Sequence, residues 1–268
     1  MYPTGHYYPS LESLEIRDDS DSLWSFPLES YPKLKSLYVR ESKNLESLFI
    51  SEESKNRDLS SLTHLRISSS PNFVSFFSGG ICAPNLTSIS IFNCNKLKSL
   101  PENMRTLFPS LEFLAVRGCP KLESFPEGGL PLNLVTLYVS YCDKLFSRGL
   151  QDLHSLREIS IDGDNCKEVE SFPEEALLPP TLTDIHISFF PKLKSLKGFQ
   201  HLTSLKKLNI FRCNNLQYLP EDGFPTTLSS LIINSCPLLK QRCEREKGEE
   251  WPKIAHIPNI VIDGELVE

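Results

Sequence analysis

Cysteine is the residue type in this 268-residue chain whose chemistry depends most on spacing, and there are eight of them. Thiolates bind zinc or form redox pairs when they are spaced C-x-x-C or alternate with histidines, and no pair here has that spacing. Five cysteines instead recur three residues after an Ile or Val that closes an apolar motif: Cys94, Cys119, Cys142, Cys213 and Cys236. We therefore expect a structural ladder of buried thiols and no metal site. Cys82, Cys166 and Cys243 fall outside this ladder and are expected to be partly exposed.

Histidines and nucleophile motifs give no sign of catalysis. The six histidines are scattered along the chain: His6, His64, His154, His186, His201 and His256. The phosphate-binding loop G-x-x-x-x-G-K-[ST], the G-x-S-x-G elbow and the H-E-x-x-H motif are missing from the sequence. The sequence thus predicts that the chain is not an enzyme and has no catalytic residue, metal or cofactor.

A repeated apolar motif determines the elements that would position any site. The motif recurs ten times. It consists of an apolar residue, two variable residues, a second apolar residue, one variable residue, and then Ile or Val. The copies begin at Leu11, Leu34, Leu62, Leu86, Leu111, Leu134, Leu156, Leu182, Leu205 and Leu228. Their starts lie about 24 residues apart, the period of leucine-rich repeats. The alternation within each copy predicts a short strand with one buried face.

Strands of this kind are stable only when neighbours stack in parallel and bury their leucines together. The sequence therefore predicts an α/β leucine-rich-repeat solenoid, a curved horseshoe with a parallel sheet on the concave face. Apolar pairs followed by proline predict few short helices or 3₁₀ turns on the convex side. We expect a single domain over residues 1–268, with about ten repeats from 11 to 236 and a capping segment from 237 to 268.

The two ends and the longest repeat carry further expectations. The first strand has no evident polar cap, which predicts exposed leucines at an open sheet edge. At the other end the last turn should be closed by Trp251, Ile254, Ile257, Ile260 and Ile262. The charged run before them, KQRCEREKGEE, should form a short helix or loop, and IPNIVIDG a final strand. The charged stretch from Ser51 to Asp58 should form a solvated loop.

Strand positions that alternate with the buried leucines should form the binding face, since solenoids commonly bind there. The predicted protein-binding residues on this concave face are Arg17, Tyr38, Arg40, His64, Arg66, Phe92, Phe113, Arg117, Tyr138, Glu158, Asp162, Asp184, His186, Lys207 and Phe211. Arginines dominate its first half and carboxylates a later section, and Phe92, Phe113 and Tyr138 form an aromatic strip between them. Arginine and aromatic side chains dominate binding energies, although a simple solvated face would have a similar composition.

Composition narrows the classes of partner. The net charge is −6 and the charged fraction 23%, which argues against nucleic acid as a partner. No stretch is long and apolar enough to cross a bilayer, and the N-terminus lacks the pattern of a secretory signal. We therefore expect a cytoplasmic protein whose cysteines stay reduced.

Two segments carry a family resemblance. LPEDGFPTTLSSLIINSCPLLKQRCEREKGEEWPKIAHIPNIVIDG, from Leu219 to Gly264, resembles the C-terminal end of plant nucleotide-binding leucine-rich-repeat (NLR) disease-resistance proteins of the coiled-coil class. FPSLEFLAVRGCPKLESFPEGGLPLNLVTLYV, from Phe108 to Val139, is similar to their repeats. The tail is the more specific part, through Cys236, Pro237, Cys243, Trp251 and the run from Lys253 to Pro258.

The resemblance implies a role in plant innate immunity and defence. The implied partner is a pathogen effector, a guarded host protein or the nucleotide-binding switch domain of a full-length receptor. The coiled-coil and nucleotide-binding regions of the family have no counterpart in these residues, so the chain is expected to be either a fragment or a stand-alone repeat protein. A substrate adaptor of a ubiquitin ligase and a stand-alone leucine-rich-repeat scaffold remain the alternatives.

Overall fold

The structure is a computed structural model that describes residues 7–17, 25–49, 59–76, 82–122, 124–126, 128–140, 150–164, 166–173 and 178–267. Contacts divide the chain into two compact units, Met1–Leu134 (unit 1) and Val135–Glu268 (unit 2), which are described one after the other. The predicted loop from Ser51 to Asp58 and the ladder cysteine Cys142 lie outside the described residues. The prediction of a single domain over residues 1–268 stays a prediction.

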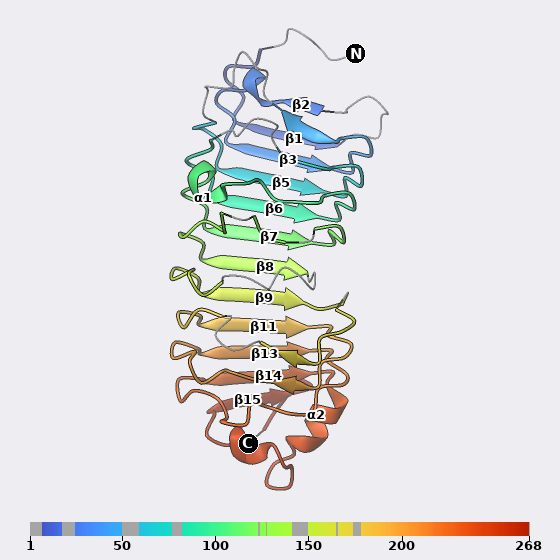
Figure 1. Cartoon of the computed structure of the whole chain (residues 1–268), viewed down its shortest axis with the longest axis vertical. Helices are drawn as coiled ribbons and strands as arrows, with labels where there is room; N and C mark the ends of the chain where they lie inside the picture. Colours follow the sequence, from blue (N-terminus) through green and yellow to red (C-terminus); the bar gives the residue numbers. More distant parts are fainter. Residues whose placement is uncertain are drawn as a thin grey trace. The chain divides into compact units, whose positions relative to one another are not determined.

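Unit 1 is built on a parallel sheet of five-residue strands (Figure 1). Its strands are β1 (Ser13–Arg17), β3 (Ser36–Arg40), β5 (His64–Ser68), β6 (Ser88–Phe92) and β7 (Phe113–Arg117). Neighbours pair without offset, so that equivalent motif positions lie side by side. The second and fourth residues of each strand point into the core, as Leu37 and Leu65 do with at most 1% of their surface exposed. This arrangement follows from the period-two pattern of the motif.

Unit 2 repeats the same construction. Its parallel strands are β8 (Thr136–Ser140), β9 (Glu158–Asp162), β11 (Asp184–Ser188), β13 (Lys207–Phe211), β14 (Ser230–Asn234) and β15 (Asn259–Ile262). A two-residue strand, β16 (Glu265–Leu266), pairs antiparallel with β15. Together with unit 1, all ten predicted motif strands are present at their predicted positions. The predicted leucine-rich-repeat solenoid fold is confirmed.

The return segments between these strands hold little helix. Unit 1 has a 3₁₀ turn η1 (Leu28–Ser30), the helix α1 (Met104–Leu107), and a small sheet of β2 (Ser25–Pro27) with β4 (Ser47–Phe49). In unit 2 the strands β10 (Ser171–Phe172) and β12 (Ser195–Leu196) form a similar pair. Their apolar side chains close the core, because Leu48 and Leu196 are at most 1% exposed. The prediction of few, short helices on this side is confirmed.

A left-handed residue follows eight of the strands that build the parallel sheets of the two units. The residue directly after the strand has a positive φ in Glu41, Ser69, Asn93, Gly118, Phe189, Arg212, Ser235 and Asp263. The reversal turns the following side chain inward, and that buried position holds Ser42, Ser70, Cys94, Cys119, Phe190, Cys213 and Cys236. The left-handed residue is thus the device that moves the chain from the sheet into the return segment.

The cysteines at this position form the predicted ladder. The Sγ of Cys94 donates to the Phe92 carbonyl at 3.6 Å, and the Sγ of Cys213 donates to the Phe211 carbonyl at 3.6 Å. The pKa of the Cys94 thiol lies well above its ordinary value, mainly because of a hydrogen bond with Cys119 and to a smaller extent because the thiol is buried. A buried thiol of this kind is inert and structural.

The expectation that all three remaining cysteines are partly exposed is wrong for two of them. Cys82 is half-buried, whereas Cys166 and Cys243 are fully buried. The N–H of Cys166 donates to the Gly163 carbonyl at 2.8 Å, in a turn that carries the side chain inward. Cys243 follows the helix α2 (Pro237–Arg242), where burial raises the pKa of its thiol to about 12.

Replacing Gly118 with alanine is expected to destabilise unit 1 by about 1–3 kcal/mol. Gly118 has a φ of 66°, and a Cβ there would lie 2.3 Å from Oδ1 of Asn93. Gly264→Ala is the matched control, because its φ is 85° and nothing lies within 4 Å of a Cβ there. Urea unfolding of both variants measures the difference. Equal losses of unfolding free energy would show that the contact with Asn93 does not matter.

The first strand of unit 1 and the last repeat of unit 2 differ in how well their cores are covered. In β1 the core positions Leu14 and Ile16 are half-buried, in keeping with the predicted exposed leucines, whereas their partners Leu37 and Val39 are fully buried. In unit 2 the helix α2 extends into the start of the charged run, and β15 lies within IPNIVIDG, in agreement with the predicted helix and final strand. Ile254, Ile257 and Ile260 are at most 5% exposed and close the last repeat.

A buried carboxylate fixes this C-terminal closing segment. Glu250, which is 4% exposed, precedes the 3₁₀ turn η3 (Trp251–Lys253). Its Oε2 accepts from the Leu219 amide and from Nζ of Lys253, both at 2.8 Å. Its Oε1 lies 3.6 Å from the Arg242 guanidinium. A carboxylate with this many donors ties α2, η3 and the last return segment together.

Candidate functional site

The first, third and fifth residues of each strand form what we call the open face of its unit. In unit 1 the predicted arginines Arg17 and Arg40 lie at the fifth position of β1 and β3, side by side in register. Oε1 of Glu15 lies 3.1 Å from Nε of Arg17 and 3.3 Å from Nε of Arg40. One carboxylate therefore balances part of the charge of both guanidinium groups, while Tyr38 lies half-buried beside Glu15 in the middle row.

The next arginine on the open face of unit 1 stacks on an aromatic ring. The guanidinium carbon of Arg66 lies 5.0 Å from the centroid of the Phe92 ring, a cation–π contact. Phe92 is paired in register with Arg117, and His64 is exposed at the first position of β5. The structure thus brings Arg66, Phe92 and Arg117 together at one end of β5 to β7.

The predicted aromatic strip is not formed between Phe92 and Phe113. Phe113 is the first residue of β7 and pairs with Ser88, whereas Phe92 is the last residue of β6 and pairs with Arg117. A parallel register without offset keeps these two positions at opposite ends of neighbouring strands. Ala115, the third residue of β7, occupies a motif position that should face outward, yet it is fully buried.

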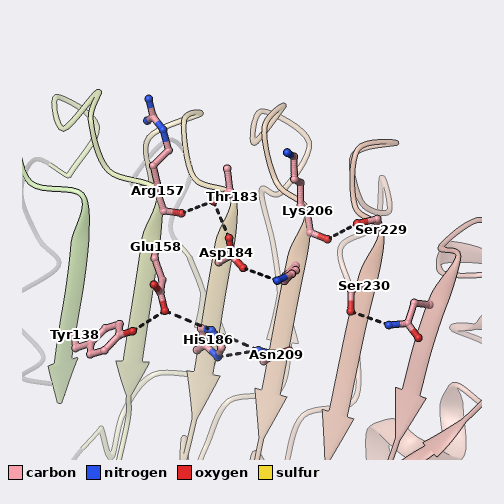
Figure 2. Close-up of polar contacts among 12 residues, drawn as sticks. Tyr138, Arg157, Glu158, Thr183, Asp184, His186, Lys206, Asn209, Ser229 and Ser230 are labelled. Carbon is pink, nitrogen blue, oxygen red and sulfur yellow. Dashed lines mark hydrogen bonds and ion pairs between the residues drawn. The ribbon is translucent and has the colours of Figure 1, made fainter.

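The open face of unit 2 carries a polar network (Figure 2). The hydroxyl of Tyr138 donates to Oε1 of Glu158 at 2.6 Å, and Nε2 of His186 lies 3.8 Å from the same oxygen. Nδ2 of Asn209 lies 2.8 Å from Nδ1 of His186. Because these four residues come from β8, β9, β11 and β13, the in-register strands bring predicted residues from successive repeats into one contact chain.

The remaining predicted residues of unit 2 lie around this network. Oδ1 of Asp184 is 3.8 Å from Nζ of Lys207, and its Oδ2 accepts from the Thr183 hydroxyl at 2.7 Å. Oδ1 of Asp162 accepts from the Asp164 amide at 3.1 Å and so stabilises the turn after β9. Phe211 is the last residue of β13 and contacts the ring of Phe189, which the sequence analysis did not include among the binding residues.

The arrangement favours binding over acid–base chemistry. The polar atoms of Glu158 and His186 are engaged by Tyr138 and Asn209, in contacts that run along the face from strand to strand. Within the described ranges, no three His, Cys, Asp or Glu side chains are grouped so that they could hold a metal ion. No helix in the described part of the chain has the length and hydrophobicity that crossing a membrane requires.

Two residues next to the open face were missed by the sequence analysis. Phe189 and Arg212 directly follow β11 and β13, beyond the last strand position that was considered. The guanidinium carbon of Arg212 lies 5.4 Å from the Phe189 ring centroid and 5.0 Å from that of Phe211. Their position in the motif could have indicated them, because each lies two residues after the closing Ile, where the chain reverses direction.

The strands, their register and the return segments define a leucine-rich-repeat protein. No family model matches the chain. The leucine-rich repeat domain of the type III effector XopL has a similar fold, with a TM-score of 0.63, 22% sequence identity, and coverage of 80% of this chain and 73% of that domain. InlP of Listeria monocytogenes gives a TM-score of 0.52 at 18% identity, over 71% of this chain and 56% of that one.

Sequence comparison identifies the kind of leucine-rich-repeat protein that the chain resembles. It is 41% identical over 264 residues, or 97% of its length, to a putative disease resistance protein of Arabidopsis thaliana. A putative disease resistance protein of Solanum bulbocastanum is 43% identical over 51 residues, or 19% of this chain and 5% of that protein. The chain spans 18% of the length of the Arabidopsis protein. The resemblance to the leucine-rich-repeat region of plant disease-resistance proteins is thus confirmed.

Proposed function

We propose that this chain is the recognition and regulatory region of a plant intracellular immune receptor, located in the cytoplasm. In this role it binds a pathogen effector or a host protein through its open face and catalyses no reaction itself. The observation that carries the proposal is the 41% identity, over 97% of the chain, to a putative disease resistance protein. In the longer receptor, a nucleotide-binding switch domain is the third partner that we propose.

The open face supports this proposal through its composition. Its residues from successive strands include arginines, aromatic rings and carboxylates, the side chains that contribute most to binding when a partner buries them. Arg66 and Lys207 are exposed on β5 and β13, one in each unit. In either unit, a partner that covers the open face would contact side chains that are not needed for the buried leucine core.

The proposal is tested with the chain, a panel of pathogen effectors and the host proteins that those effectors modify. We expect at least one of these proteins to bind, and Arg66→Glu or Lys207→Glu to raise its Kd about tenfold or more, because charge reversal inside an interface is repulsive. Lys98→Glu and Lys167→Glu are the matched controls, since both lysines are exposed outside the strands.

Biolayer interferometry on all four variants gives the Kd values, and circular dichroism verifies that each variant is folded. A complex that is weakened by the control substitutions but not by the open-face substitutions would contradict the assignment of the face. If no effector and no host protein in the panel binds, the recognition function itself is contradicted.

A further inference from the structure

Two phenylalanines and an arginine form a compact group where β11 and β13 of unit 2 end. The rings of Phe189 and Phe211 meet edge to face, with centroids 5.4 Å apart and planes at 78°. The guanidinium of Arg212 contacts both rings, at 5.4 Å and 5.0 Å. Phe211 belongs to the open face, so the group extends that face around the turns.

The backbone at this group is strained. Phe189 has a φ of 59° and Arg212 a φ of 50°, a left-handed conformation that costs residues with a Cβ about 1–2 kcal/mol. Glycine adopts it freely, and Gly118 occupies the equivalent position in unit 1. Phe189 is half-buried and Arg212 exposed, so burial in the core does not offset the strain. The same conformation follows six other described strands, so it belongs to the fold, and what distinguishes this group is the two rings and the guanidinium that it holds.

The guanidinium of Arg212 is held against the two rings, and among the described residues no carboxylate forms an ion pair with it. Nearby carboxylates are occupied otherwise. Asp263 binds Nζ of Lys240 and the Ser235 amide, at 2.8 Å and 2.7 Å, which lowers its pKa below the ordinary value. Asp162, which lies two strands away from Phe211, accepts a hydrogen bond from the Asp164 amide. The donors of Arg212 are therefore available to a carboxylate from outside.

We propose that Phe189, Phe211 and Arg212 form a docking point for a protein segment that carries an Asp or Glu beside an apolar side chain. The carboxylate binds the planar fork of Arg212 donors, which contact with the two rings holds in place, and the apolar side chain covers the two phenylalanine rings. Arginine and aromatic anchors of this type contribute most of the energy in many interfaces. The inference rests on the proposed recognition function and specifies the chemistry of the partner.

A nucleic acid is a poorer match for this group. Binding to a phosphate backbone requires several cations along a track, whereas a single guanidinium stands here among two rings. The whole chain has a net charge of −6, which repels polyanions. A single carboxylate next to an apolar side chain requires only one cation and one apolar surface. Arg212 supplies the cation, and the rings of Phe189 and Phe211 supply the surface.

The test uses an array of eight-residue peptides in which one Asp or Glu is flanked by Leu or Phe, each with a twin that has Asn or Gln in place of the acid. The chain is expected to bind acidic members at least about tenfold more tightly than their amide twins, the usual scale for a charge-assisted contact. Arg212→Gln should abolish this preference, and Arg212→Lys should retain only part of it because an ammonium lacks the planar fork.

Two further variants make the result decisive. Phe189→Gly removes one ring while relieving backbone strain, so it should fold at least as stably as the native chain and yet bind the acidic peptides more weakly. Arg245→Gln is the matched control, because Arg245 is exposed and pairs with Glu246 at 3.7 Å. It should leave peptide binding unchanged.

The inference is overturned if no acidic peptide exceeds its amide twin, or if the preference survives in Arg212→Gln. Loss of binding in Arg245→Gln to the same extent would also overturn it. These outcomes are separate from the test of the proposed function. An effector complex that forms normally with Arg212→Gln would leave the recognition function intact and remove only this docking point.

Discussion

Replacing Glu250 with alanine is expected to lower the free energy of unfolding by about 3–5 kcal/mol, the range for breaking a buried ion pair from one side. Glu250 is 4% exposed and accepts from the Leu219 amide and from Lys253. Without it the amide and the partly buried ammonium lose their acceptor, and Arg242 loses a nearby charge. Urea unfolding followed by tryptophan fluorescence, with Trp251 next to the substituted residue, measures the loss.

Two control substitutions, one at Glu249 and one at Glu250 itself, separate the loss of the buried carboxylate from a general change of charge. Glu249→Ala removes a carboxylate that also contacts Arg242 but has 75% of its side chain exposed. Its expected cost is below about 1 kcal/mol, as for exposed ion pairs. Glu250→Gln keeps an oxygen for the Leu219 amide and should fall between the two alanine variants. If Glu249→Ala and Glu250→Ala cost the same, the closing segment does not depend on the buried carboxylate.

Leu65→Ala in β5 is expected to cost about 2–5 kcal/mol, because it leaves a cavity between β3 and β6 in a fully packed core. Leu65 is 1% exposed and has a buried leucine or isoleucine beside it on both neighbouring strands. Leu14 occupies the same motif position in β1 but is half-buried. Leu14→Ala should therefore cost roughly half as much or less, in proportion to the smaller apolar area that it removes from water.

The comparison between these two leucines is made by urea unfolding of the same chain under the same conditions. Ile67→Val, which removes a single methylene from the same buried row, is a control with an expected cost of about 1 kcal/mol. Equal costs for Leu14→Ala and Leu65→Ala would mean that the core position of β1 is as fully packed as that of β5. That result would contradict the half-buried environment described for β1.

The strands and the buried row were predictable because a period of two fixes which side chains share a face. The motif and a parallel register without offset together place Phe92 and Phe113 at opposite ends of neighbouring strands. The prediction of an aromatic strip between them was therefore wrong, although the sequence contained enough information to avoid it. The contacts of Tyr138 with Glu158 and of Asn209 with His186 follow from the same register. Their distances depend on rotamers, which no pattern of residue types specifies.

Other features were beyond pattern analysis for physical reasons. The left-handed positions after the strands hold Glu, Ser, Asn, Asp, Phe and Arg as well as Gly, so residue type does not predict the reversal or the group around Arg212. Glu250 lies in a run of charged residues that looks like a solvated surface, and only the chain path brings the Leu219 amide to it. Burial of Cys166 likewise depends on its turn with Gly163 and not on the spacing of the ladder.

The short antiparallel strand β16 has a consequence for self-association. A stack of parallel strands ends in a row of unpaired amides and carbonyls, which invites a second molecule to add itself and so to start a fibre. Here β15 is covered by Glu265 and Leu266, running the opposite way over two residues and bringing a carboxylate to the rim. An incoming strand would meet a reversed, charged and very short template, and growth of an aggregate from this end is thereby suppressed.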